Sequence, residues 1–186
     1  MPTFEPTDIG DVFLIKPEIH RDERGFFLET FREEWFRERG IEVQFVQDNL
    51  SRSQRGTVRG LHYQIRRRQA KLIMVVSGTI RDVALDLRRG SPTFGQHTSV
   101  VLSEVNKRQL YIPQGFAHGF SVLSEEALVA YKCSDYYDAE AERGVLWNDP
   151  GLGIEWEVDR PVVSDKDRQQ PRLTEIPKKD LFEYQP

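Results

Sequence analysis

Short runs of apolar, β-branched and aromatic residues recur along almost the whole chain, and turn residues separate them. Runs of this kind are typical of β-strands, and many of them at close spacing are typical of a sandwich or barrel. The sequence therefore predicts a mainly β fold, a double-sheet β-barrel of the jelly-roll type with short peripheral helices. The expected strands cover residues 12–16, 26–31, 43–48, 58–64, 72–76, 79–87, 98–102, 109–112, 118–123 and 128–134.

Two segments have a different pattern. Residues 31–40 carry apolar side chains at Phe31, Trp35 and Phe36, and Gly40 stands where a helix would end, so we expect one short helix there. The tail after Asp159 is rich in proline and charged residues and is expected to wrap the outside irregularly. A length of 186 residues indicates a single domain, residues 1–186, with its N-terminal arm and C-terminal tail packed on the barrel.

Composition excludes several classes of protein. Hydrophobic residues make up 38% and charged residues 30%, which argues against both a membrane protein and a disordered chain. The first residues lack the basic start and apolar stretch of a signal peptide. The net charge of −4 predicts no nucleic-acid partner. The single cysteine, Cys133, fits a reducing compartment, so a cytoplasmic location is expected.

The densest group of chemically useful side chains is Arg59–Gln64, followed by Gln69–Leu72. Strict alternation would put Arg59, Leu61 and Tyr63 on one face and Gly60, His62 and Gln64 on the other. Gly60 would leave space beside His62, and Lys71 would share a face with Ile73. In the following β pattern, Val83, Leu85 and Leu87 alternate with Asp82, Ala84 and Asp86, as in a half-buried strand.

Three further groups each allow a structural and a functional interpretation. His118 lies in the glycine-rich run 113–120, which suits either a packed histidine beside a turn or a site. Tyr131 lies in the run 130–137, where core packing is the default, although a phenol facing a cavity can deliver a proton. Ser164–Asp167 has the composition of a solvated turn or a helix cap.

Neither a metal nor another cofactor is expected. Cupin-type barrels often bind a metal through a His-x-His pair, a following Glu and a later His. Here the pair position reads His62-Tyr63-Gln64, and Lys71 stands where the acid would follow. An ammonium is a poor neighbour for a divalent metal. Glycine-rich phosphate-loop and dinucleotide motifs are also missing from the sequence.

Nine short motifs occur in a family-like order between about residue 12 and about residue 171: 22–29, 45–49, 59–64, 69–72, 91–95, 112–120, 131–132, 146–149 and 164–167. They resemble the dTDP-4-dehydrorhamnose 3,5-epimerase family, cupin-type enzymes of nucleotide-sugar biosynthesis. The resemblance implies inversion of dTDP-4-dehydro-6-deoxy-glucose at C3 and C5 in dTDP-rhamnose biosynthesis. The C4 ketone acidifies both C–H bonds, and the chemistry needs a base, an acid on the opposite face and a group that stabilises an enolate oxygen.

The resemblance also assigns roles to residues. His62 matches the base, Asp167 its carboxylate partner, Tyr131 the proton donor and Lys71 the cation near the C4 oxygen. Some substrate contacts come from a partner subunit in the family, which implies a homodimer. The matched contacts are Arg24 and Arg59 at the diphosphate, Phe27 and Glu29 at the thymine, Gln47 and Asn49 at the nucleotide, and His118, Glu142 and Lys166 elsewhere on the substrate.

Three alternatives stay open or are weighed against this assignment. A relative that inverts only C3 or only C5 could carry the same His62, Asp167, Lys71 and Tyr131. A non-catalytic sugar-nucleotide-binding barrel would not need all four residues. A metal-dependent cupin oxygenase fails on the ligand count given above.

Overall fold

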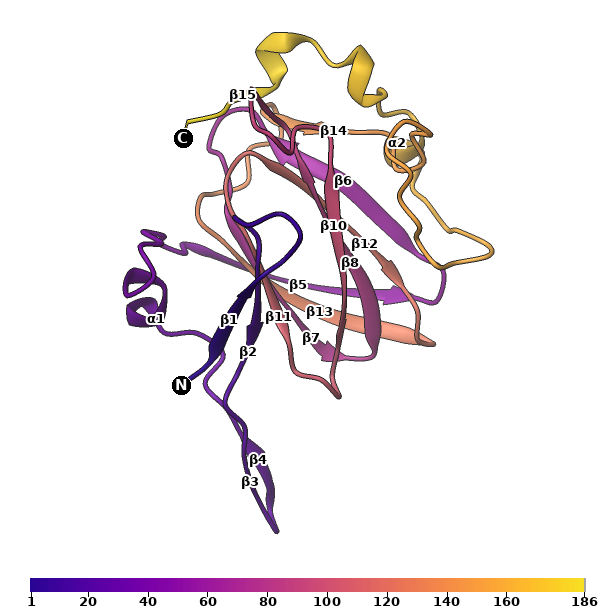
Figure 1. Cartoon of the computed structure of the whole chain (residues 1–186). Helices are drawn as coiled ribbons and strands as arrows, with labels where there is room; N and C mark the ends of the chain where they lie inside the picture. Colours follow the sequence, from indigo (N-terminus) through magenta and orange to yellow (C-terminus); the bar gives the residue numbers. More distant parts are fainter. Residues whose placement is uncertain (186) are drawn as a thin grey trace.

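Two antiparallel sheets face one another in the computed structural model, which describes residues 1–185 (Figure 1). The six-stranded sheet consists, in order, of β1 (Thr3–Pro6), β2 (Phe13–Lys16), β11 (Gln109–Ile112), β7 (Lys71–Ser77), β13 (Glu126–Cys133) and β5 (Gln47–Gln54). The five-stranded sheet consists of β10 (His97–Ser103), β8 (Thr79–Asp86), β12 (Phe116–Val122), β6 (Val58–Gln64) and β14 (Glu142–Gly144). This architecture confirms the predicted mainly β, double-sheet fold.

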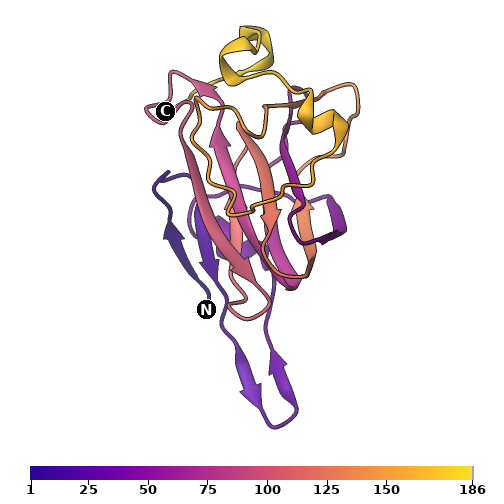
Figure 2. The same ribbon diagram turned by 90° about the vertical axis from the view of Figure 1, so that its right-hand side faces the viewer.

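Smaller elements surround the two sheets. A hairpin of β3 (His20–Asp22) and β4 (Gly25–Phe27) projects well beyond the sheets (Figure 2). Near the C-terminus, β15 (Phe182–Glu183) pairs in parallel with β9 (Arg88–Arg89). The helices are α1 (Glu33–Arg37) and α2 (Asp165–Arg168), with 3-10 turns at η1 (Leu173–Glu175) and η2 (Lys178–Asp180). The helix predicted within 31–40 is confirmed as α1, which buries Trp35 and Phe36.

Two strands have other bounds than those expected from the sequence. The strand expected at 26–31 is only the short β4, and the one expected at 43–48 begins at Gln47 and runs to Gln54. Val43 and Phe45 instead pack as irregular chain against the cluster around α1. The sequence of β5 is polar and has little strand propensity, so its pairing with β13 along eight residues makes it a strand.

The space between the sheets holds the main apolar core. The six-stranded sheet contributes Ile73, Val75, Leu110, Ile112 and Val129 to this core. The five-stranded sheet contributes Ile80, Leu102, Phe116, Phe120 and Val122. The C-terminal part of the chain covers the outer face of the five-stranded sheet, where Trp156, Ile176 and Phe182 pack on Leu61 and Leu85. Helix α2 belongs to this covering layer, and its residue Asp167 is buried.

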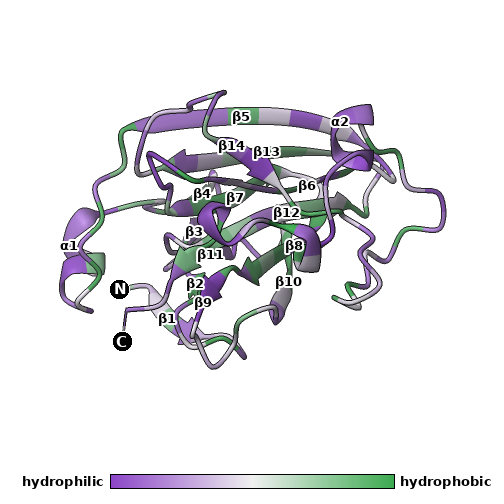
Figure 3. Cartoon of the chain, turned by 90° about the horizontal axis from the view of Figure 1, so that it is seen from above, coloured by the Kyte–Doolittle hydropathy of each residue, from purple (hydrophilic) through white to green (hydrophobic). Residues whose placement is uncertain are grey.

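The expectation that residues 82–87 form a half-buried strand is wrong. Val83 and Leu85 are buried under the C-terminal layer, and the opposite face is buried too, because it faces the second sheet. Asp82 and Asp86 are therefore both fully buried on the interior side of β8. Figure 3 shows hydrophobic residues along β8 and β12 but hydrophilic ones along much of β5. The space between the two sheets therefore contains charged and polar side chains as well as the apolar core.

Candidate active site

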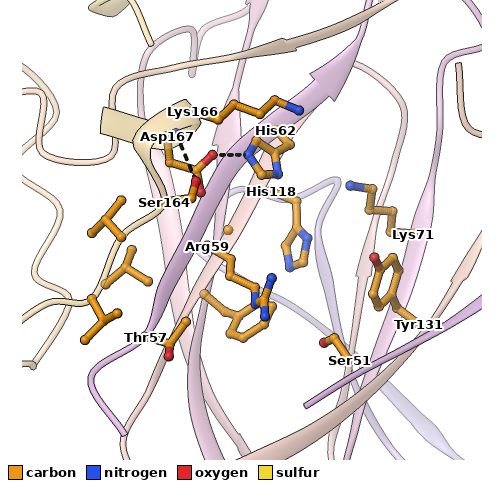
Figure 4. A pocket seen from close by; sticks show the side chains of 15 residues that line it. Ser51, Thr57, Arg59, His62, Lys71, His118, Tyr131, Ser164, Lys166 and Asp167 are labelled. Atoms are coloured by element: carbon orange, nitrogen blue, oxygen red, sulfur yellow. Dashed lines mark hydrogen bonds and ion pairs between the residues drawn. The ribbon is translucent and has the colours of Figure 1, made fainter. Parts of the chain in front are cut away.

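A cavity of about 580 Å³ opens between the sheets, and the four residues matched to catalytic roles line it (Figure 4). His62 comes from β6 and Asp167 from α2, on one wall. Lys71 comes from β7 and Tyr131 from β13, on the opposite wall. Because the two walls belong to different sheets, groups that are far apart in sequence face each other across the space between them.

His62 and Asp167 form a tight pair. Asp167 Oδ1 lies 2.6 Å from His62 Nε2, and Asp167 Oδ2 accepts from the Gly60 N–H at 3.3 Å. Burial alone would raise the pKa of Asp167, but the hydrogen bond and charge of His62 and the Gly60 N–H leave it below its usual value. An ionised carboxylate only accepts, so Nε2 carries the ring proton and Nδ1, which points into the cavity, keeps its lone pair (Figure 4).

The position of Asp167 follows from its local sequence. Ser164 caps α2, and its hydroxyl accepts from the Asp167 N–H at 3.1 Å. The chain before the helix is held by hydrogen bonds between Val162 and both Gly56 and Val58. The cap expected from composition is therefore present, but Asp167 is 3% exposed rather than solvated.

Lys71 and Tyr131 present unpartnered polar ends to the cavity. Among residues 1–185, neither Lys71 Nζ nor the Tyr131 hydroxyl makes a hydrogen bond or ion pair with the protein. Burial lowers the pKa of Lys71 and raises the pKa of Tyr131. A phenol with a raised pKa stays protonated at neutral pH, and a desolvated ammonium is well placed to attract a developing negative charge.

His118 lines the same cavity and belongs to a second histidine–aspartate pair. His118 Nε2 is 2.5 Å from Asp82 Oδ1, and both side chains are buried. The other carboxylate oxygen, Asp82 Oδ2, has no hydrogen-bond partner in the described part of the chain. Sequence reasoning singled out His118 but missed Asp82. The available signal was an acid within an otherwise apolar strand pattern, on the face of β8 that turns inward.

Arg59 and His62 line the same cavity, contrary to the strict alternation expected for residues 59–64. The pairing of β6 with β12 shifts register between His118 and Phe120, so His118 faces His62 but Phe120 faces Arg59. Such a bulge adds one residue to one strand and turns the next side chains to the other face. The bulge therefore lets Arg59 and His62 line the same cavity.

A second cavity, of about 370 Å³, shares His62, Lys71 and Tyr131 with the first. Gln47 and Asn49, which were matched to the nucleotide, line it together with Glu142, which was matched to another part of the substrate. Glu142 accepts hydrogen bonds from Lys166 and, at 2.7 Å, from the Tyr137 hydroxyl, which sequence reasoning missed. Burial alone would raise the pKa of Glu142, but the Lys166 and Tyr137 hydrogen bonds lower it.

The chain matches a known protein family over most of its length. Residues 6–175 match the family described as dTDP-4-dehydrorhamnose 3,5-epimerase. The chain belongs to the dTDP-4-dehydrorhamnose 3,5-epimerase family. A family member from Pseudomonas aeruginosa is 55% identical over 163 residues, which is 87% of this chain and 90% of that protein.

Solved structures of the family agree. A dTDP-6-deoxy-D-glucose-3,5-epimerase from Legionella pneumophila, in complex with dTDP-4-keto-L-rhamnose, is 48% identical and covers both chains fully with a TM-score of 0.98. A 3'-monoepimerase from Streptomyces bikiniensis, in complex with dTDP-quinovose, is 38% identical with a TM-score of 0.86. That match covers 91% of this chain and 87% of the other.

Three residues matched to substrate binding lie away from the cavity of this epimerase-family chain. Arg24 and Phe27 lie on the projecting β3–β4 hairpin, where the Arg24 side chain is 86% exposed and Phe27 is 66% exposed. Glu29 follows the hairpin and pairs with Arg32 at 2.5 Å. None of the three lines either cavity at His62. Within one chain, these three residues therefore lie apart from the ten other residues that were matched to catalysis or substrate binding, all of which line one of the two cavities.

Three further observations concern metal ligands, the cysteine and membrane-spanning helices. In residues 1–185, no three His, Cys, Asp or Glu side chains converge as metal ligands would. Cys133 is buried on β13 directly opposite Lys71. Across the same residues, every helix is too short or too polar to cross a bilayer.

The contact between Gly60 and Gly119 holds β6 and β12 close together beside the site, and it gives a stability prediction. A Cβ at residue 119 would lie 2.7 Å from the Arg59 carbonyl oxygen and 3.2 Å from Gly60 Cα, so backbone would have to move. We expect Gly119→Ala to lower the free energy of unfolding by about 1–3 kcal/mol and to reduce activity. Urea denaturation measures this, with Gly10→Ala as the control because no atom lies within 4 Å of that Cβ. A change in the control as large as that in Gly119→Ala would contradict the steric argument.

Proposed function

We propose that this chain inverts dTDP-4-dehydro-6-deoxy-D-glucose at C3 and C5, giving dTDP-4-dehydro-L-rhamnose for dTDP-rhamnose biosynthesis. One observation carries the proposal: the His62–Asp167 pair faces Lys71 and Tyr131 across a single cavity. An imidazole lone pair on one wall and a phenol proton on the other suit removal and return of a proton on opposite faces of one carbon. A binding protein would not need that arrangement.

The residues divide the reaction as follows. His62 Nδ1 takes the proton next to the ketone, and the negative charge moves onto the C4 oxygen as an enolate. Asp167 keeps the ring in the required tautomer and stabilises the imidazolium that forms. Lys71 stabilises the enolate oxygen, and Tyr131 returns a proton from the other face. The enolate collapses to the ketone, with the carbon inverted.

Incubation with the substrate in D₂O tests this proposal. Proton NMR and mass spectrometry should show deuterium at both C3 and C5, and a reductase should convert the product to dTDP-rhamnose. No exchange, together with tight binding of dTDP, would favour a binding protein and overturn the mechanism.

Inversion at one carbon only is the second candidate, and the similarity to the Streptomyces bikiniensis 3'-monoepimerase supports it. Both reactions use the same base, acid and cation. The D₂O experiment separates them, because the single-carbon enzyme would leave either C3 or C5 without deuterium.

Replacement of Tyr131 by phenylalanine should separate exchange from inversion. The phenol is lost while His62, Asp167 and Lys71 remain, so the first proton is still removed and can return from the same face. We expect product formation to fall about 10²–10³-fold while deuterium enters recovered substrate much faster than product forms. Equal losses of exchange and product would contradict a donor role.

We also propose that the enzyme is a homodimer in which the hairpin of one subunit reaches the cavity of the other. Arg24 and Phe27 match nucleotide contacts, yet they lie on a projecting hairpin away from His62. The outer face of the six-stranded sheet also exposes Leu50 and Val76 beside a groove of about 340 Å³. A second copy that covers this face would supply the missing contacts.

Heterodimers test the shared site. One subunit carries His62→Ala and its partner carries Arg24→Ala with Phe27→Ala, each with a different affinity tag. If the hairpin acts on its partner, one site in the heterodimer has both an intact base and an intact hairpin, and about half the wild-type activity per dimer is expected. If the hairpin serves its own chain, the heterodimer is no more active than the mean of the two parents.

A further inference from the structure

The connection between β13 and β14 contributes Tyr137 to the wall of the smaller cavity. Among residues 1–185, no backbone–backbone hydrogen bond involves Asp135, Tyr136 or Tyr137. Tyr136 and Tyr137 are also more than half exposed, so little packing holds their side chains. A segment of this kind keeps one conformation only if side chains bind its peptide groups.

Gln64, the last residue of β6, holds this segment at two points. Its Oε1 accepts from the Asp138 N–H at 2.8 Å, and its Nε2 donates to the Tyr136 carbonyl oxygen at 3.2 Å. Nε2 also donates to the Arg67 carbonyl oxygen at 2.7 Å, in the connection from β6 to β7. Gln64 is 5% exposed, so both Nε2 donors are committed to peptide groups and are not free for a ligand. The side chain therefore joins two connections that each pass from one sheet to the other.

Two further glutamines bind the same segment. Gln69 Nε2 donates to the Asp135 carbonyl oxygen at 2.9 Å, and the Tyr137 N–H donates to Gln47 Oε1 at 2.9 Å. All three glutamines line the smaller cavity, as Tyr137 does. Each residue from 135 to 138 thus has a peptide group bound by a glutamine of this wall.

We propose that Gln64 is a positioning residue, which fixes residues 135–138 so that the Tyr137 side chain forms part of the nucleotide-binding wall before the nucleotide arrives. This inference rests on the proposed function, since residues matched to the nucleotide line the same cavity. The Tyr137 hydroxyl donates to Glu142 at 2.7 Å, so displacement of the segment would also break that contact. A wall already in place spares the ligand the entropy cost of ordering it. Gln64 thus acts on nucleotide affinity and not on the chemical step.

Calorimetry with dTDP and steady-state kinetics test this role in Gln64→Met, which keeps most of the volume but loses all three hydrogen bonds. We expect the Kd of dTDP and the KM of the sugar nucleotide to rise about five- to tenfold, with kcat within about twofold of wild type. Gln64→Glu keeps an acceptor but turns the other against two carbonyl oxygens, so it should bind dTDP no better than Gln64→Met. Gln69→Met loses one hydrogen bond at a less buried position and should show a smaller change in the same direction.

Two measurements distinguish positioning from a general loss of structure. Amide hydrogen exchange, followed by mass spectrometry, should become faster in Gln64→Met for a peptide covering residues 134–139 but not for one covering β10. The exposed Tyr137 ring allows the variant Tyr137→Ala to fold. In that background, Gln64→Met should weaken dTDP binding little further, because Gln64 acts through Tyr137.

Each outcome has a distinct meaning. A dTDP affinity within about twofold of wild type in both Gln64 variants overturns the proposal. So does a lower kcat with an unchanged KM, which would place the effect on the catalytic groups. Additive losses in the double variant would show that Gln64 acts independently of Tyr137, and faster exchange in every peptide would indicate general unfolding; either result overturns the proposal. A wild-type protein that does not bind dTDP would contradict the proposed function, and this role with it.

Discussion

Replacement of His62 by alanine is expected to abolish deuterium exchange at both C3 and C5. The same imidazole serves both carbons, so the two rates should fall together, by about 10³–10⁴-fold. Nucleotide binding should remain, because the matched nucleotide contacts Gln47 and Asn49 lie on another strand. NMR in D₂O measures the exchange and calorimetry with dTDP measures the binding.

The control for this variant is His97→Ala, since His97 lies on β10 outside both cavities. Thermal unfolding should accompany the assay, because removal of His62 leaves the buried Asp167 carboxylate with fewer hydrogen bonds. Added imidazole that restores part of the exchange would support a missing base rather than a damaged fold. Near-normal turnover in His62→Ala would remove this residue from the mechanism.

Replacement of Lys71 by methionine should lower kcat about 10²–10³-fold with little change in fold. Methionine keeps most of the volume but removes the charge that would stabilise the enolate oxygen. Because the enolate is common to both carbons, exchange at C3 and at C5 should fall in parallel. Lys16→Met is the matched control, since Lys16 pairs with Glu5 on an edge strand. A Lys71→Met enzyme that exchanges both protons at the wild-type rate would contradict the assignment.

The same lysine predicts a pH dependence. Burial lowers the pKa of Lys71, so its ammonium loses its proton at lower pH than an exposed lysine does. Wild-type activity should therefore fall on the alkaline side, below the usual lysine range, as the charge is lost. The raised pKa of Tyr131 keeps the phenol protonated over that interval. Lys71→Met should lack this alkaline limb in a plot of kcat against pH.

Hydrophobic pattern predicted most of the fold because most strands bury apolar side chains. The strand predicted at 109–112 has the same limits in the structure, and Lys71 and Ile73 share the interior face of β7 as expected. Prediction failed where burial depends on a distant segment. No local pattern reveals that the C-terminal layer covers β8, or that β5 is a strand although its inward residues are polar.

The same distinction applies to the site. His62 and Lys71 stood out because histidine, glycine and lysine gather within a few residues. Asp167 could be proposed only from resemblance, since its local sequence is that of a helix cap, and its contact with His62 spans 105 residues of chain. The presence of both Arg59 and His62 in one cavity depends on a bulge, which strict alternation does not predict.

The two cavities that meet at His62, Lys71 and Tyr131 bear on the timing of a double inversion. With the proposed roles, each inversion leaves His62 with an extra proton and Tyr131 without one. Neither group is ready for the second carbon until it has exchanged with water. Because two cavities reach the same three residues, water can approach His62 and Tyr131 from a side that the sugar does not occupy. The half-converted sugar can then wait in place while the protein resets, so both inversions can belong to a single binding event.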